Sequence, residues 1–147
     1  MLKDKNNDLL HLLSVIESIE KIKAYSHALE TAEDFFEYNE QLNFNATLTL
    51  LMNIGETAGK FSDDLLAKSP EIPWDKIRGL RHRIAHDYAG LDIVVIFDVI
   101  KNKLPDFLNA LYALTTKRLQ EGILSVEELN LTVGSRYYLH IDFKRFS

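Results

Sequence analysis

Apolar residues recur every three or four positions along most of this chain, which is the spacing of one face of an α-helix. Helix-breaking segments interrupt the pattern, most clearly at residues 69–73, where two prolines lack the amide hydrogen that a helix interior needs. The long helices predicted from this pattern cover residues 7 to about 29, about 40 to 68, 93 to 104, and 105 to 119 or beyond. Such a succession of amphipathic helices predicts an all-α protein, folded as an up-and-down helical bundle.

Individual residues mark where helices should begin and where they should approach one another. Thr31 and Asp92 carry side-chain oxygens that can accept an N–H bond from the first turn of a following helix, so each is a predicted N-cap. Gly55 and Gly59 lie inside the second long helix, where each costs about 1 kcal/mol relative to alanine. We expect these glycines to permit the close approach of another helix backbone.

The C-terminal residues have a different character. Residues 129–133 and 136–141 are rich in residues that favour strands, and the dipeptide between them, Gly134-Ser135, fits a type II′ turn. We therefore predict a short β-hairpin in a C-terminal tail of residues 125–147, after a helical domain of residues 1–124. A single hairpin is marginally stable, so the tail must dock on the bundle, pair with another chain or stay mobile.

The composition excludes several classes of protein. The chain has no cysteine, so it has neither disulfides nor thiolate metal ligands. No apolar run approaches the roughly 20 residues of a transmembrane helix, and the first residues lack the apolar segment of a signal peptide. The expectation is a soluble cytoplasmic protein.

A positively charged segment stands out within this acidic chain. Residues 74–88 carry four cations and two carboxylates, a net charge of +2, whereas the remainder of the chain carries −7. Four hydrophobic residues spaced three or four apart predict one amphipathic helix here: Ile77, Leu80, Ile84 and Tyr88. Its polar side is a local site for anions.

Three interpretations of this helix compete. It can be a solvated basic face, which is the commonest outcome for such helices. It can be a metal site, because His82 and His86 are four residues apart, but Arg83 stands where zinc proteases of this spacing have a glutamate, and the neighbouring cations repel a metal. It can also bind phosphate, because an arginine grips phosphate with two N–H groups while a histidine moves a proton near neutral pH. Arg81 and His86 are about 140° apart around an ideal helix, so they converge only if the helix ends near His86 or a second subunit completes the site.

The order of residues in this segment resembles the signature of the HEPN superfamily, specifically its HepT-like toxins. The signature is Arg81, four residues, His86, one residue and Tyr88, with His82 at a position that is usually small and polar or histidine. The resemblance covers roughly residues 13 to 112, and further segments fall in the family's order and spacing: residues 53–60, 72–74, 77–81, 86–88 and 90–92.

The resemblance implies a metal-independent endoribonuclease that needs no cofactor and works as a homodimer, with the two signature helices lining one cleft. In such a reaction the ribose 2′-OH attacks the adjacent phosphorus and leaves a 2′,3′-cyclic phosphate. His86 is then the candidate acid or base, and Arg81 is the candidate phosphate ligand that stabilises the transition state. The remaining candidates are three ligands for RNA phosphates, Arg78, His82 and Arg83, and two carboxylates that can support the catalytic side chains, Glu56 and Asp87.

The family also implies a partner, an MNT-type nucleotidyltransferase antitoxin that transfers AMP from ATP to the tyrosine of the signature, here Tyr88. The added phosphodiester would compete with RNA for Arg81 and His86. A core tyrosine that closes the helix is the structural alternative for Tyr88. The rival function is a non-catalytic helical subunit that binds nucleotide or substrate for a nucleotidyltransferase. The Arg81–His86 pair favours the enzyme, since a pure binder needs no proton shuttle.

Overall fold

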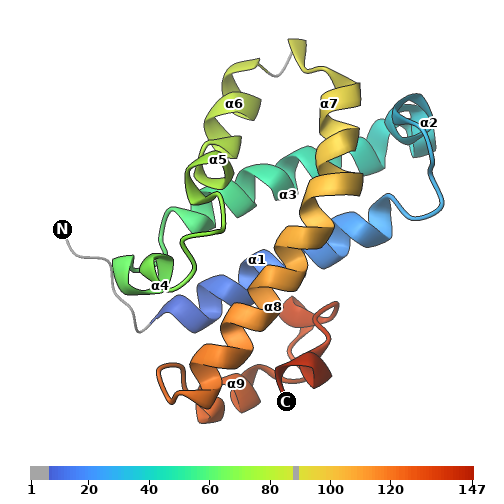
Figure 1. The fold of residues 1–147 in the computed structure, drawn as a ribbon. Helices are drawn as coiled ribbons and strands as arrows, with labels where there is room; N and C mark the ends of the chain where they lie inside the picture. Colours follow the sequence, from blue (N-terminus) through green and yellow to red (C-terminus); the bar gives the residue numbers. More distant parts are fainter. Residues whose placement is uncertain (1–6, 88–89) are drawn as a thin grey trace.

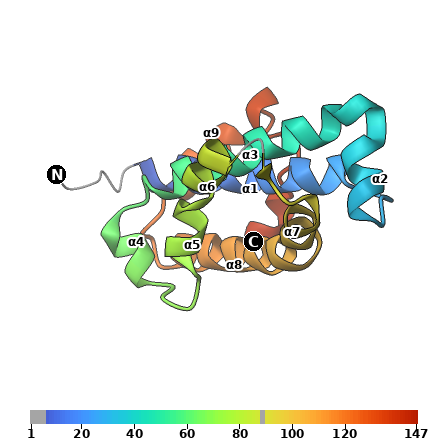
Figure 2. The ribbon, with the colours of Figure 1, turned by 90° about the horizontal axis from the view of Figure 1, so that it is seen from above.

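Two long helices, α1 (Asp8–Tyr25) and α3 (Leu42–Ala58), pack side by side at the centre of the fold (Figure 1). The structure is a computed structural model, and it describes residues 7–87 and 90–147. A third long helix, α8 (Leu104–Gln120), packs on α1, and Figure 2 shows α3 and α8 on opposite sides of α1. The interior between them consists of fully buried aliphatic side chains, among them Leu12, Ile16, Leu51, Ile54 and Leu111. The prediction of an all-α bundle is confirmed.

The other helical segments are short and surround this centre. They are α2 (Ala32–Glu37), η2 (Tyr38–Gln41), α4 (Asp63–Ala67), α5 (Trp74–Arg78), α6 (Leu80–Asp87), α7 (Ile93–Asp98), the π-helical turn η4 (Val99–Lys103), α9 (Val126–Thr132), η5 (Arg136–Tyr138) and η6 (Phe143–Phe146). Of the helices within the described ranges, none has both the length and the hydropathy needed to cross a membrane.

Helix α1 ends before the predicted limit near residue 29. The hydroxyl of Ser26 donates to the carbonyl oxygen of Ile22 at 2.9 Å, and Ala28 adopts a left-handed φ of 64°. A helix cannot continue through a left-handed residue. The next predicted start is confirmed, because the side chain of Thr31 accepts the N–H of Asp34 at 3.1 Å and caps α2.

The second long helix is shorter at both ends than the predicted residues 40–68. It begins at Leu42, because the three residues before it, 39–41, have left-handed φ angles. It ends at Ala58, and α4 starts afresh after Ser62. The Ser62 hydroxyl accepts the N–H of Leu65 at 3.2 Å. The backbone N–H of Ser62 donates to the buried carboxylate of Asp8 at 2.9 Å. This capping at Ser62 divides one predicted helix into two.

Pro105 has less effect than predicted. Instead of one helix ending at residue 104 and another starting at 105, the chain runs from α7 through the π-helical turn η4 into α8 without a break. Proline lacks the N–H of a regular turn, and its ring clashes with a carbonyl four residues earlier. The wider π turn just before Pro105 accommodates both effects. Asp92 caps the start of this helical run as predicted, accepting the N–H of Val94 at 2.9 Å.

The predicted C-terminal hairpin is wrong. Residues 126–132 form α9, residues 136–138 form the 3₁₀ turn η5, and the described part of the chain contains no β-strand. The side chain of Ser125 accepts the N–H of Glu128 at 3.1 Å and so starts a helix where strand propensity pointed to a strand. Gly134 does adopt a left-handed φ of 87°, but it lies between helical segments.

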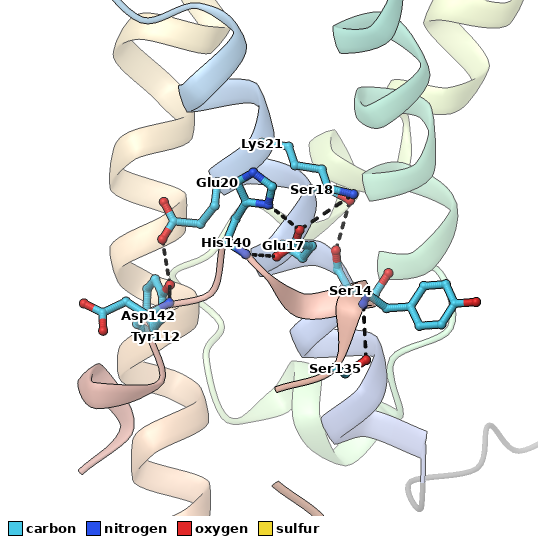
Figure 3. A network of polar contacts seen from close by, with 10 residues as sticks. Ser14, Glu17, Ser18, Glu20, Lys21, Tyr112, Ser135, His140 and Asp142 are labelled. Atoms are coloured by element: carbon cyan, nitrogen blue, oxygen red, sulfur yellow. Dashed lines mark hydrogen bonds and ion pairs between the residues drawn. The ribbon is translucent and has the colours of Figure 1, made fainter. Parts of the chain in front are cut away.

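The tail docks on the bundle through the polar network shown in Figure 3. The buried carboxylate of Glu17 on α1 accepts the backbone N–H of His140 at 2.6 Å and lies 2.7 Å from the ring Nδ1 of that histidine. The phenol of Tyr112 on α8 donates to Glu20 at 2.7 Å and accepts the backbone N–H of Asp142 at 2.9 Å. Burial raises the pKa of Tyr112, which keeps the phenol protonated as a donor to Glu20.

Candidate ribonuclease site

The arginine-rich segment forms two helices rather than the single helix predicted. α5 and α6 meet at Gly79 and run in different directions (Figure 1). Trp74 anchors α5, since its indole N–H donates to the carbonyl oxygen of Ser69 at 2.9 Å and its ring lies edge-on to Phe61 and Phe107. Gly79 suits the junction because glycine is a weak helix former, so one helix can end there and another begin.

Both helices present the predicted apolar side to the core and the predicted polar side to solvent. Ile77 and Ile84 are buried and Leu80 is half-buried. The polar candidates on α6 are all exposed: Arg81, His82, Arg83, His86 and Asp87. Tyr88 lies outside the described residues, so its predicted position beside the site stays a prediction.

Gly55 sets how closely α6 approaches α3. A Cβ at this position would lie 2.9 Å from the backbone nitrogen of Arg81 and 3.0 Å from the carbonyl oxygen of Ile77. Side chains cannot make contacts this short with backbone atoms, so only glycine fits without moving α5 or α6. The expected close approach is confirmed at Gly55. At Gly59 the nearest atom to an added Cβ is the carbonyl oxygen of Glu56, in the preceding turn at 3.2 Å.

The same stretch of α3 supplies the partner of Arg81. The Nε of Arg81 lies 3.5 Å from a carboxylate oxygen of Glu56, with the two side chains 60% and 54% exposed. An ion pair this exposed contributes little to folding stability, but it places a carboxylate beside the guanidinium. The contact involves Nε, and the terminal nitrogens of an arginine can bind a phosphate.

The two histidines of α6 lie against each other. The ring centroids of His82 and His86 are 4.2 Å apart with an angle of 44° between the rings. Within the described residues no group of three or more His, Asp or Glu side chains is arranged to hold a metal ion, so this pair finds no third protein ligand there. Arg78, the remaining cation of the predicted set, is paired with Asp75 on its own helix.

His86 also borders a cavity of about 440 Å³ between α6 and α7. Arg83 and Asp87 line it beside His86, and Val95 and Val99 of the next helical run form part of its apolar side. Arg81 does not line this cavity. One copy of the chain therefore directs Arg81 toward α3 and His86 toward α7, in keeping with their separation around the helix. The apolar lining of this cavity from α7 and η4 depends on how those elements pack against α6. The sequence pattern therefore could not predict this lining.

The structure is a helical bundle that exposes an arginine and a histidine on one helix, α6. The sequence matches the ribonuclease HepT-like family over residues 15–114, which is more than half of the chain. The chain belongs to this family of the HEPN superfamily, as its motifs predicted. The prediction of a ribonuclease is confirmed at the level of the family.

Several known proteins are similar to this chain. A protein named "Probable ribonuclease HepT" from Thermococcus cleftensis is 30% identical over 95 residues, which cover 65% of this chain and 84% of the relative. A protein named "Putative RNase MJ1380" from Methanocaldococcus jannaschii is 28% identical over 95 residues, covering 57% of this chain and 87% of the relative. No solved structure gives a significant match.

Proposed function

We propose that this chain is a metal-independent endoribonuclease and the toxin of a toxin–antitoxin pair. The observation that carries the proposal is the exposed guanidinium of Arg81, which lies 3.5 Å from Glu56 at Nε and five residues before the exposed His86. This arrangement offers a phosphate ligand and a proton-transfer group on one surface helix. Ribonuclease family membership supports the use of that surface for RNA.

The proposed reaction breaks the P–O5′ bond of RNA. The 2′-oxygen attacks the adjacent phosphorus, its proton passes to a base, and the departing 5′-oxygen receives a proton, leaving a 2′,3′-cyclic phosphate and a 5′-hydroxyl. His86 carries one of these proton transfers. The terminal nitrogens of Arg81 neutralise the charge that develops on the non-bridging oxygens. Arg83 and His82 lie on the same exposed helix and extend the positive surface along the RNA backbone.

Cleavage is expected to persist in excess EDTA and to leave cyclic-phosphate ends. No step of the proposed reaction uses a metal, because Arg81 supplies the positive charge and His86 the proton transfer. Mass spectrometry of the products from a short defined RNA, cleaved with and without EDTA, measures both properties. Activity that disappears on chelation and returns with zinc or magnesium would support His82 and His86 as metal ligands instead.

The active form is proposed to be a homodimer in which two α6 helices face one cleft. Arg81 and His86 point to different neighbours in one copy, so a second copy is needed to bring an arginine and a histidine to one phosphate. Light scattering coupled to size exclusion should give twice the 16.9 kDa chain mass at assay concentrations. A fully active monomer would contradict this arrangement.

Tyr88 is the proposed regulatory site, modified by an MNT-type nucleotidyltransferase. Tyr88 follows His86 by two residues, so an AMP group on its hydroxyl would bring a charge of about −1 close to the cations of α6. Incubation with ATP, magnesium and the cognate nucleotidyltransferase should add AMP to the protein and stop RNA cleavage. The Tyr88→Phe protein should accept no AMP at this position. Its rate of RNA cleavage should be the same before and after incubation with the nucleotidyltransferase.

Peptide mapping supplies the control for the Tyr88 experiment. Tyr137 is 76% exposed and so is an accessible alternative acceptor. AMP found on Tyr137 with Tyr88 unmodified would place the regulatory site in the tail and refute the assignment.

A further inference from the structure

A second cavity lies on a different part of the molecule from α6. It has a volume of about 280 Å³ and is formed by the C-terminal end of α1, the π turn with the start of α8, and Arg145 of η6. No residue of α5 or α6 lines it, so it is separate from the candidate ribonuclease site. Its size is near the lower end of pockets that bind small molecules.

The floor of this cavity is aliphatic. Five of its lining side chains are buried members of the core: Ile19, Ile22, Ile100, Leu104 and Leu108. The described residues that line the cavity include no Phe, Tyr or Trp, and the small imidazole of His27 is the one aromatic ring among them, so a nucleobase would find little to stack on. The floor therefore suits a flexible aliphatic group better than a planar one.

The rim of the same cavity is positively charged. Lys23, Lys101 and Arg145 border it, whereas none of its described lining residues is Asp or Glu. Three cations without a carboxylate are unexpected by composition in a chain of net charge −5. The combination of an aliphatic floor and a cationic rim matches an anionic group attached to an aliphatic chain.

Two of the three cations are held in place by the fold. The Nζ of Lys101 donates to the carbonyl oxygen of Ser26 at 2.8 Å, which leaves further N–H groups for a ligand. The guanidinium of Arg145 lies 3.9 Å from the centre of the Tyr112 ring and donates to Asn109 at 3.0 Å. The position of Lys101 can be explained by its bond to the end of α1 alone. That bond does not explain why Arg145 also lies at the cavity, since Arg145 belongs to the tail beyond the family match at residues 15–114.

We propose that this cavity binds a free, medium-chain aliphatic carboxylate. The aliphatic chain would lie on Ile19, Ile22 and Ile100, and the carboxylate would accept hydrogen bonds from Lys101 and Arg145. The tail would thereby complete a binding site that the matched part of the family does not contain in full. The proposal is independent of the ribonuclease chemistry.

Sodium octanoate is the probe, titrated into the full chain with ¹³C-labelled isoleucine methyl groups and followed by NMR. Octanoate should shift the methyl signals of Ile19, Ile22 and Ile100 and leave those of Ile54 and Ile84, which lie elsewhere in the core, unchanged. Octanol, which lacks the charge, should bind at least about tenfold more weakly, since one charge-assisted hydrogen bond accounts for such a factor. Acetate, which lacks the chain, should cause no shift.

Paired substitutions distinguish a specific binding site for octanoate from non-specific attraction of the anion to surface cations. The double variant Lys101→Gln with Arg145→Gln should weaken octanoate binding about tenfold or more. The matched control is Lys117→Gln with Lys144→Gln, which removes two exposed charges, one from α8 and one from η6, outside this cavity. The control should bind octanoate as the parent does.

Four results would overturn the proposal. The first is equal binding of octanol and octanoate, and the second is parental octanoate binding by the Lys101 and Arg145 double variant. The third is an absence of shifts at the three isoleucines. The fourth is a protein that sediments with phosphatidylglycerol vesicles but does not respond to octanoate. In the last case the ligand would be a membrane surface rather than a free carboxylate.

Discussion

Replacing His86 with alanine is expected to lower RNA cleavage by roughly a hundredfold or more, the contribution of a positioned acid or base. Replacing Arg81 with alanine should cost about as much, because a preorganised donor to the transition state contributes a similar factor. Both side chains are exposed on the polar side of α6, so neither substitution removes a core contact. Circular dichroism should therefore show unchanged helical content, and expression of either variant should not produce the growth arrest that we propose for the parent.

Matched controls make the comparison specific. Lys76→Ala removes an exposed cation from the neighbouring helix α5, and His27→Ala removes an exposed histidine that is distant from α6 in the sequence. Both should cleave RNA at close to the parental rate. Parental cleavage by the His86→Ala protein would remove the catalytic assignment, while loss of activity in Lys76→Ala as well would indicate general charge rather than a defined site.

Replacing Gly55 with alanine is expected to damage both stability and activity. The added Cβ would press on the backbone of Arg81 and Ile77, and backbone atoms cannot yield as the end of a side chain can. Crowding of this kind typically costs about 1–3 kcal/mol in the free energy of unfolding. Displacement of α6 should also move Arg81 relative to Glu56, so cleavage should fall even at temperatures where the variant is fully folded.

Gly59→Ala is the control for this experiment. Gly59 lies one turn later, has an ordinary φ of −64°, and an added Cβ meets only the preceding turn. Gly59 is the C-cap of α3 in a right-handed conformation that alanine also adopts, so this variant should lose much less stability than Gly55→Ala. Urea unfolding followed by circular dichroism measures both free energies. If the two glycine variants behave alike, the contact at Gly55 does not position α6.

The fold class was predictable because the apolar spacing in the long helices is strong and local. Leu12, Ile16, Leu51 and Ile54 occupy the buried positions that the pattern assigns to them. Helix ends are harder to predict, because competing caps decide them. The apolar pattern places Ser62 inside a long helix, yet its hydroxyl starts a new one with the help of Asp8, which is distant in sequence.

The hairpin prediction for the tail failed for a different reason. Strand propensity reflects how well a side chain packs on a pleated, half-buried surface, and it changes with context. Leu131 and Leu139 are largely exposed, so the residues that suggested strands have no sheet to pack against. The sequence did contain the better signal, since Ser125 followed three residues later by Glu128 is the pattern of a capping box at a helix start.

The candidate site was only partly predictable. The residues of α6 could be identified because their types and spacing are contiguous in the sequence. Their neighbours could not, because the pairing of Arg81 with Glu56 depends on how α6 crosses α3. The sequence indicated Glu56 as a carboxylate that can support the catalytic side chains, but only the close contact at Gly55 explains why it lies beside Arg81.

The docking of the tail bears on where this protein can be cut. The family match stops at residue 114, which invites a truncation there for expression or crystallisation. Yet the carboxylate of Glu17, on the first helix, finds its hydrogen-bond partners at His140, near the last residues of the chain. A shortened protein would keep every candidate ribonuclease residue, but it would lose both contacts of His140 with Glu17 and the last turns of α8. The end of the family match and the end of the packed structure thus fall at different places in this sequence.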